Sequence, residues 1–185
     1  QFDSRYMNIL FALDKLTFYS ESAERTCRIL FRLYQVDQDK FRYSNSPYSS
    51  LLNALCFTNT YFPFPISKKV ELLLYFWQED SYHGAKLIIG ILNKKVMFLP
   101  SQYGRIGQYH ETKLYYAEYY HAIEQIAEAS LRYFISVSDI ESIIAVFENY
   151  VNYRPQFLMD LAHLLEGNSF DAASLAKLNY ALRKT

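Results

Sequence analysis

The stretch that most constrains this chain is residues 111–134, which read ETKLYYAEYYHAIEQIAEASLRYF. At 100° per residue, the tyrosines and isoleucines gather in one arc, whereas the glutamates, His121 and Arg132 fill the other. The pattern predicts one amphipathic helix of roughly 35 Å, about the width of such a domain, so neighbouring helices should pack along it. The residues predicted to be buried are Tyr115, Tyr116, Tyr119, Tyr120, Ile123, Ile126, Ser130, Tyr133 and Phe134.

The composition of the whole chain agrees with a helical fold. Its 185 residues suffice for one domain with its own core. Hydrophobic residues make up 51% of the sequence, whereas glycine and proline number only five each, too few for a domain built on many tight β-turns. We therefore expect a single, mainly α domain over residues 1–185, an irregular helical bundle or short α-solenoid of about seven or eight helices.

One segment, residues 82–104, leaves two interpretations open. It can form a helix followed by a loop, which we prefer, or a small β-hairpin near 86–99. In the hairpin, KLIIGIL and VMFLP are the strands and the turn lies at residues 93–95. Isoleucine and valine favour the hairpin, but an isolated hairpin is only marginally stable unless it packs against a helix.

Local signals mark where several helices begin. Ser46 followed by Pro47 is typical of an N-cap and the first helical position. Ser67 is predicted to cap the next helix. The sequence Ser-Asp-Ile-Glu at 138–141 has the spacing of a capping box, with Ser138 as the cap.

Charge and cysteine usage limit the environment. The chain has 19 basic and 19 acidic residues, so no overall field attracts nucleic acid or an anionic membrane. No apolar run is long enough to span a bilayer, and no signal-peptide pattern opens the sequence. Cys27 and Cys56 lie in apolar helical patterns, which favours buried, reduced thiols in an intracellular (cytoplasmic or nuclear) protein. Because it starts without methionine, we expect a fragment of a longer protein.

The sequence contains few patterns that indicate a metal or cofactor site. The sequence has no phosphate-binding glycine pattern, no nucleophile elbow and no CxxC pair, so we expect no cofactor. The pairs Glu118 with His121 and Asp160 with His163 resemble the ligand spacing of di-iron four-helix proteins. Both pairs are predicted to lie off the buried helix faces, however, so we expect no metal site.

A different motif suggests an enzyme. The sequence from Arg105 to His110 is RIGQYH, an arginine and a histidine separated by four residues. This arrangement resembles the motif of the HEPN superfamily of helical ribonucleases. The resemblance covers these six residues and implies metal-independent RNA cleavage, with Arg105 and His110 acting on the scissile phosphate. Ile106 replaces the polar residue usual after the arginine, and Gly107 loosens the helix.

The preferred function is protein binding. The chain has 18 tyrosines and 14 phenylalanines, more than one core needs, and such residues are enriched at helix seams and protein interfaces. Arg25, Arg28 and Arg32 recur at helical spacing and predict a cationic ridge. We expect a protein–protein interaction or scaffolding module in a larger intracellular assembly, which binds another protein or another part of its parent chain. The candidate contact residues are Arg25, Arg28, Arg32, Tyr43, Tyr48, Tyr61, Phe62 and Phe64.

Overall fold

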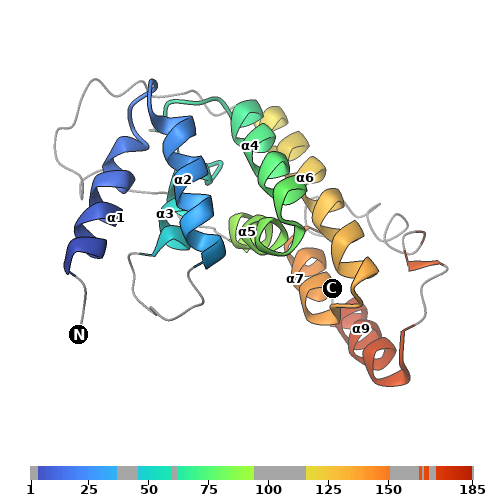
Figure 1. The fold of residues 1–185 in the computed structure, drawn as a ribbon. Coiled ribbons are helices and arrows are strands. Elements are labelled where there is room, and N and C mark those ends of the chain that lie inside the picture. Colours follow the sequence, from blue (N-terminus) through green and yellow to red (C-terminus); the bar gives the residue numbers. More distant parts are fainter. Residues whose placement is uncertain are drawn as a thin grey trace.

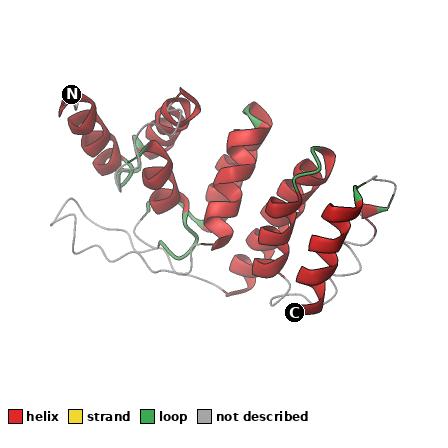
Figure 2. Cartoon of the chain, turned by 90° about the horizontal axis from the view of Figure 1, so that it is seen from below, coloured by secondary structure: helices red, strands yellow, loops and turns green. Residues whose placement is uncertain are grey.

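The computed structural model describes residues 4–36, 46–59, 62–93, 116–150, 163, 165, 166 and 170–184. All regular secondary structure within these ranges is helical (Figure 2), which confirms the mainly α prediction. The helices are α1 (Ser4–Leu16), α2 (Ala23–Val36), α3 (Pro47–Leu55), α4 (Ile66–Glu79), α5 (Ser81–Asn93), α6 (Tyr116–Ser136), α7 (Ile140–Tyr150) and α9 (Ala172–Lys184).

The helices follow one another through space in chain order (Figure 1). The first three lie at one end, α4, α5 and α6 lie in the middle, and α7 and α9 lie at the other end. Helix α6 packs against α4, α5 and α7, so neighbouring helices do lie along it as predicted. Helix α5 packs against α3, α4, α6 and α7. It is therefore α5 that joins the first helices to the last.

The buried face of α6 is partly the predicted one. Ile126 and Phe134 are buried as expected, but alanines such as Ala127 contribute to the same face. Small side chains allow neighbouring helices to approach closely. The predicted buried face did not include these alanines. Tyr120 is 46% exposed, which corrects its predicted burial. It lies in the second turn of α6, where its neighbour Tyr119 makes the contact with the ring of Phe57 instead.

Helix α5 covers residues 81–93, so the first strand of the alternative hairpin is not formed. The second strand and the remaining residues to 104 lie outside the described residues. A short helix buried on most sides has the same apolar content as a buried strand, which is why the periodicity was ambiguous. The glycine at position 84 is needed here, because a Cβ atom would lie 2.6 Å from the backbone nitrogen of Trp77 in α4.

Helix starts follow the predicted chemistry at one site and differ at another. Ser46 caps α3 in a reciprocal pair with Ser49, and Pro47 occupies the first helical position, both as predicted for this helix. Helix α4 instead starts directly after Pro65, with no side-chain cap. The prediction that Ser67 is its cap is therefore wrong, because Ser67 already lies in the first turn.

The junction between α6 and α7 shifts the predicted capping box by one residue. Ser138 has a φ of 55°, and the amide of Asp139 donates to the carbonyl of Phe134 at 2.9 Å. These features form a Schellman motif with serine at the left-handed position. The cap of α7 is Asp139, whose carboxylate accepts from the Ser142 amide at 3.1 Å and from its hydroxyl at 2.8 Å.

The close approach of α4 and α5 predicts different costs for two glycine substitutions. Gly84→Ala should lower the free energy of unfolding by about 2 kcal/mol or more, because its methyl group would meet backbone atoms that cannot move alone. Gly90→Ala should cost less than about 1 kcal/mol, because it meets the side chains of Tyr48 and Leu52 and gains helix propensity. Urea unfolding followed by far-UV circular dichroism compares the two. Equal costs would contradict the close approach.

The left-handed serine predicts a stabilising substitution. Ser138→Gly should raise the free energy of unfolding by about 1 kcal/mol, because glycine adopts a positive φ without the Cβ clash. Ser136→Gly is a matched control two residues away at the last residue of α6, where the backbone is helical and glycine should be destabilising by up to about 0.5–1 kcal/mol. Denaturant unfolding of the three proteins measures both effects, and a destabilising Ser138→Gly would show that the backbone is not left-handed there.

Candidate functional site

The first two helices form an antiparallel hairpin whose outward side is apolar. Only Leu10 of α1 is fully buried, so this helix meets the core along a narrow line. Ile9 and Leu16 of α1 are 54% and 41% exposed. Ile29 and Val36 of α2 are 41% and 72% exposed. Each pair is separated by seven residues, or two helical turns, so each forms a stripe along one face of its helix.

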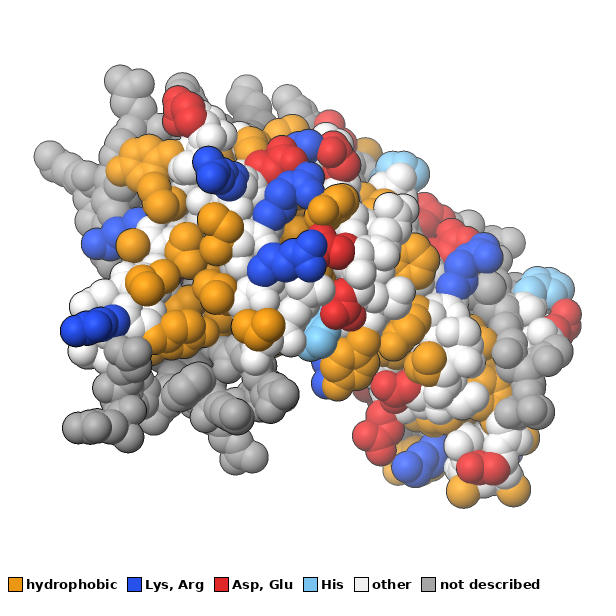
Figure 3. Space-filling view, viewed as in Figure 1, with side chains coloured by type: hydrophobic (Ala, Val, Ile, Leu, Met, Phe, Trp, Pro, Cys, Tyr) orange, Lys and Arg blue, Asp and Glu red, His pale blue; other side chains and the backbone are white. Residues whose placement is uncertain are grey.

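Positively charged residues lie in the same two stripes. At the helical spacing i, i+4, i+7 and i+11, each stripe contains two further exposed residues. Figure 3 shows the hydrophobic side chains spread over α1 and α2, with lysine and arginine side chains around and between them. We call this surface the outer face. It consists of Arg5, Ile9, Ala12 and Leu16 from α1, and Arg25, Ile29, Arg32 and Val36 from α2.

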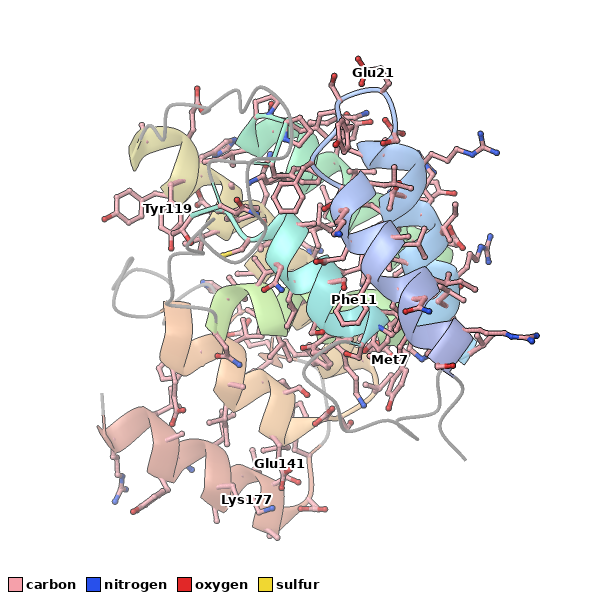
Figure 4. All side chains as sticks on the ribbon, turned by 90° about the vertical axis from the view of Figure 1, so that its left-hand side faces the viewer. Met7, Phe11, Glu21, Tyr119, Glu141 and Lys177 are labelled. Atoms are coloured by element: carbon pink, nitrogen blue, oxygen red, sulfur yellow. The ribbon has the colours of Figure 1, made fainter. Side chains whose placement is uncertain are left out.

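The remaining apolar side of α1 points elsewhere. Met7 and Phe11 lie on the side of α1 next to α3 (Figure 4). Phe11 is two positions from Ile9, a rotation of about 200° around the helix axis, so the two side chains point in nearly opposite directions. The large apolar residues of the outer face are therefore aliphatic, and Phe11, although 47% exposed, lies on another side of α1.

Helix α2 packs against α3 and makes several side-chain contacts with α4. The rings of Phe31 and Phe76 stack at 4.3 Å with an interplanar angle of 11°. Beside this stack, the Arg28 guanidinium lies 3.9 Å from the ring centre of Tyr75 and donates to Glu24 at 2.8 Å. The Arg28 hydrogen bond is the main reason that the pKa of Glu24 is lowered. Arg28 thus belongs to the seam between α2 and α4.

The predicted cationic ridge is therefore split. Arg25 and Arg32 lie on the outer face, whereas Arg28 is 39% exposed and packs against Tyr75 of α4, and its contact with a partner stays a prediction. Arg32 lies 2.7 Å from a carboxylate oxygen of Glu79, an ion pair whose atoms are not aligned for a hydrogen bond. The Arg32 side chain is nevertheless 68% exposed, so most of its donors point to the outside.

Of the aromatic contact residues predicted near the third helix, the three that the structure describes pack toward the core. Phe62 is fully buried and packs edge-to-face with Phe64 at 5.2 Å, which corrects its predicted place at an interface. Tyr48 and Phe64 are partly buried and pack against the core. Tyr43 and Tyr61 lie outside the described residues. Hydrophobicity alone did not distinguish these interior rings from exposed Ile29, whose signal was its place between two arginines.

The described residues include only part of the two sets of residues proposed for ribonuclease and metal chemistry. Arg105 and His110 lie outside the described residues, so the ribonuclease motif stays a prediction. Glu118 and His121 are exposed on α6, in the polar arc where they were predicted. Asp160 is also outside the described part. Within that part, no three histidine, cysteine or acidic residues are grouped as metal ligands.

The most unusual polar group is a lysine inside the core, which sequence reasoning missed. Lys69 is 1% exposed, and its ammonium donates to the backbone carbonyls of Cys56 at 2.9 Å and Asn59 at 2.6 Å. Cys56 is the C-cap of α3, so the lysine satisfies a carbonyl at the negative end of that helix. Burial lowers the pKa of Lys69 to about 7. The arrangement holds α4 against the end of α3.

The surroundings of Lys69 do not form a reactive centre. Both cysteines are free and buried, as predicted from the sequence. Burial raises the pKa of Cys27 to about 12, so its thiol stays protonated and unreactive at neutral pH. A cavity of about 10 Å³ adjoins Cys56 and Tyr119 between α5 and α6, the space of roughly one water molecule. The outer face is therefore the better candidate site.

Comparison of the chain with protein-family models, with curated proteins and with solved structures gives no match in any of the three. Of the helices in the described ranges, none combines the length and the apolar character that crossing a bilayer requires. The function is therefore argued from the geometry of the outer face and its charges.

The buried lysine predicts a stability that rises with pH. The unfolded chain keeps the Lys69 proton up to about its ordinary pKa of 10.5, whereas the folded chain releases it near 7. Above pH 7 the unfolded state therefore binds more protons, and the free energy of unfolding should increase by up to about 1.4 kcal/mol per pH unit. Urea unfolding between pH 6.5 and pH 8.5 measures the slope. Most of this range lies below the ordinary thiol pKa of 9.0, around which Cys27 in the unfolded chain titrates with the opposite effect on stability.

The variant Lys69→Met tests the assignment. It should lose the slope, while its two unpaired carbonyls are destabilising by about 1–3 kcal/mol each. A methionine variant that retains the slope would assign it to another group. If the variant does not fold, a flat pH dependence of the unchanged protein would by itself contradict the lowered pKa.

Proposed function

We propose that this chain is a protein-binding module and that its outer face is the contact surface, within a larger intracellular assembly. The observation that supports the proposal is the pairing of Ile9 with Leu16 and of Ile29 with Val36 on two adjacent helices, all four at least 41% exposed. Single exposed aliphatic residues are ordinary, but a contiguous patch of them is typical of an interaction site.

The energetics of the outer face suit binding. Complete burial of an aliphatic side chain is favourable by about 1.5–3 kcal/mol, so partly exposed residues such as Ile29 and Val36 still gain on contact with a partner. The α2 part of the surface is also preformed, because α2 packs against α3 and stacks Phe31 on Phe76 of α4. A preformed surface loses little conformational entropy on binding, which leaves more of the contact energy as affinity.

The arginines supply the polar rim that such surfaces have. Arg25 and Arg32 flank Ile29 along α2, so a partner that buries the isoleucine also meets two guanidinium groups. Arginine and large apolar residues together dominate the energy of many interfaces. The proposed contact residues are thus Arg25 and Arg32 from the predicted ridge, together with the aliphatic residues that lie between and beside them.

A photo-crosslinking experiment tests the proposed surface. The photoreactive amino acid p-benzoylphenylalanine is placed at position 29 or at position 175, which is exposed on α9 to a similar extent, 44% against 41%. After irradiation in the cells from which the chain comes, the cross-linked protein is identified by mass spectrometry and purified. We expect a defined adduct from position 29 and none from position 175.

The purified partner then allows a binding measurement. Ile29→Asp should weaken binding at least tenfold, because a carboxylate would be buried against apolar surface, whereas Leu175→Asp should change the affinity less than about twofold. Isothermal titration calorimetry measures the dissociation constants. Thermal unfolding confirms that both variants fold, since exposed substitutions have small effects on stability. Equal effects of the two substitutions would refute the outer face as the contact surface.

A further inference from the structure

The charge and spacing of the outer face specify what kind of segment fits it. We propose that it receives an amphipathic α-helix with two acidic residues seven positions apart, which pair with Arg25 and Arg32. This inference rests on the proposed function and goes further, because it states the chemistry of the partner. It follows from the repeat along α2, from the charge of the face and from the hairpin that forms it.

The repeat along α2 matches another helix. Arg25, Ile29, Arg32 and Val36 alternate charged and apolar along one stripe, and the two arginines are two turns apart, about 10.5 Å along the axis. A partner helix repeats on the same spacing, so acidic residues at i and i+7 can face the arginines while apolar residues at i+4 and i+11 face Ile29 and Val36. In a strand, side chains on one face recur every ~6.6 Å, which does not match this distance.

The charge of the outer face favours an acidic partner. Each stripe has arginine, and neither stripe contains an acidic residue. Of the nearby carboxylates, Glu24 is held by Arg28 and Lys68 at the seam with α4. Glu79 makes an ion pair with Arg32, which remains 68% exposed and has further donors for a second carboxylate. Because the whole chain has equal numbers of basic and acidic residues, this positive charge is local to the face.

Other occupants fit less well. Two copies of the same face would place arginines near arginines, and like charges disfavour such a contact. An anionic membrane attracts clusters of roughly four to eight basic residues, whereas the outer face has three arginines, one of them paired with Glu79. A third helix can also pack along the shared side of two adjacent antiparallel helices.

Synthetic peptides test the inference on the whole chain. The first is a fluorescein-labelled, alanine-based helix of about 20 residues with glutamate at i and i+7 and leucine at i+4 and i+11. The second has lysine in place of both glutamates. The double variant Arg25→Glu, Arg32→Glu reverses the charge of the face, and Arg132→Glu, Arg183→Glu is the matched double reversal on α6 and α9. Fluorescence anisotropy measures each dissociation constant at low and high salt.

We expect the acidic peptide to bind the unchanged chain and the α6/α9 control alike, and more weakly at high salt. It should bind the Arg25→Glu, Arg32→Glu variant at least tenfold more weakly, whereas the lysine peptide should prefer that variant. This exchange of preference requires direct pairing at positions 25 and 32, and misfolding of a variant cannot produce it. Equal binding of both peptides to both proteins would overturn the inference.

Two other outcomes overturn it in favour of a different occupant. One is sedimentation with vesicles of phosphatidylcholine and phosphatidylserine that depends on Arg25 and Arg32, without peptide binding. The other is a dimer of the chain that Ile29→Asp dissociates. If neither peptide binds but the cross-linked partner still requires Ile29, the acidic helix is wrong and the binding function stands. If Ile29→Asp leaves the partner's affinity unchanged, the binding function itself is refuted.

Discussion

The arrangement of this protein depends on the seam between α2 and α4. The stacked rings of Phe31 and Phe76 lie inside this seam. At its edge, the Arg28 guanidinium lies over the ring of Tyr75. The angular positions of the side chains around a helix axis are fixed. The burial of the Phe31 ring therefore determines which residues of α2 point away from the core. Ile29 is two positions before Phe31, about 200° around α2, and is directed outward for that reason. The core contact therefore creates the outer face.

The buried lysine adds a second constraint on the same helices. Lys69 connects α4 to the end of α3 through two backbone carbonyls, although transferring an ammonium from water into the core is unfavourable. A neutral amine still has two N–H donors, enough for both carbonyls, so the contact survives loss of the proton. The position of α4 thus rests on polar contacts with α3 and on ring stacking with α2. Because α2 also packs against α3, the same contacts support the α2 part of the outer face.

Features that depend on residues close in the sequence could be predicted. Features that depend on the packing of another helix could not. The cap at Ser46 and the burial of Ile126 follow from residues within one or two turns, and both were predictable. The residues around Gly84 do not show why a glycine is needed at that position. The reason is the close approach of the Trp77 backbone in α4. The capping box at Ser138 moved by one residue because the end of α6 already used that serine in a left-handed conformation.

The same reasoning explains which part of the candidate site was predictable. Arg25, Arg28 and Arg32 share a helical spacing, so the sequence indicates a ridge but cannot show which member another helix will cover. Helix α4 partly covers Arg28 with Tyr75 and pairs Glu79 with Arg32, while Arg25 and most of the Arg32 side chain stay exposed. What remains is two guanidinium groups on either side of an isoleucine. Two cations at a fixed separation can distinguish one register of a partner helix from another, because a shift of one turn leaves at least one of them unpaired.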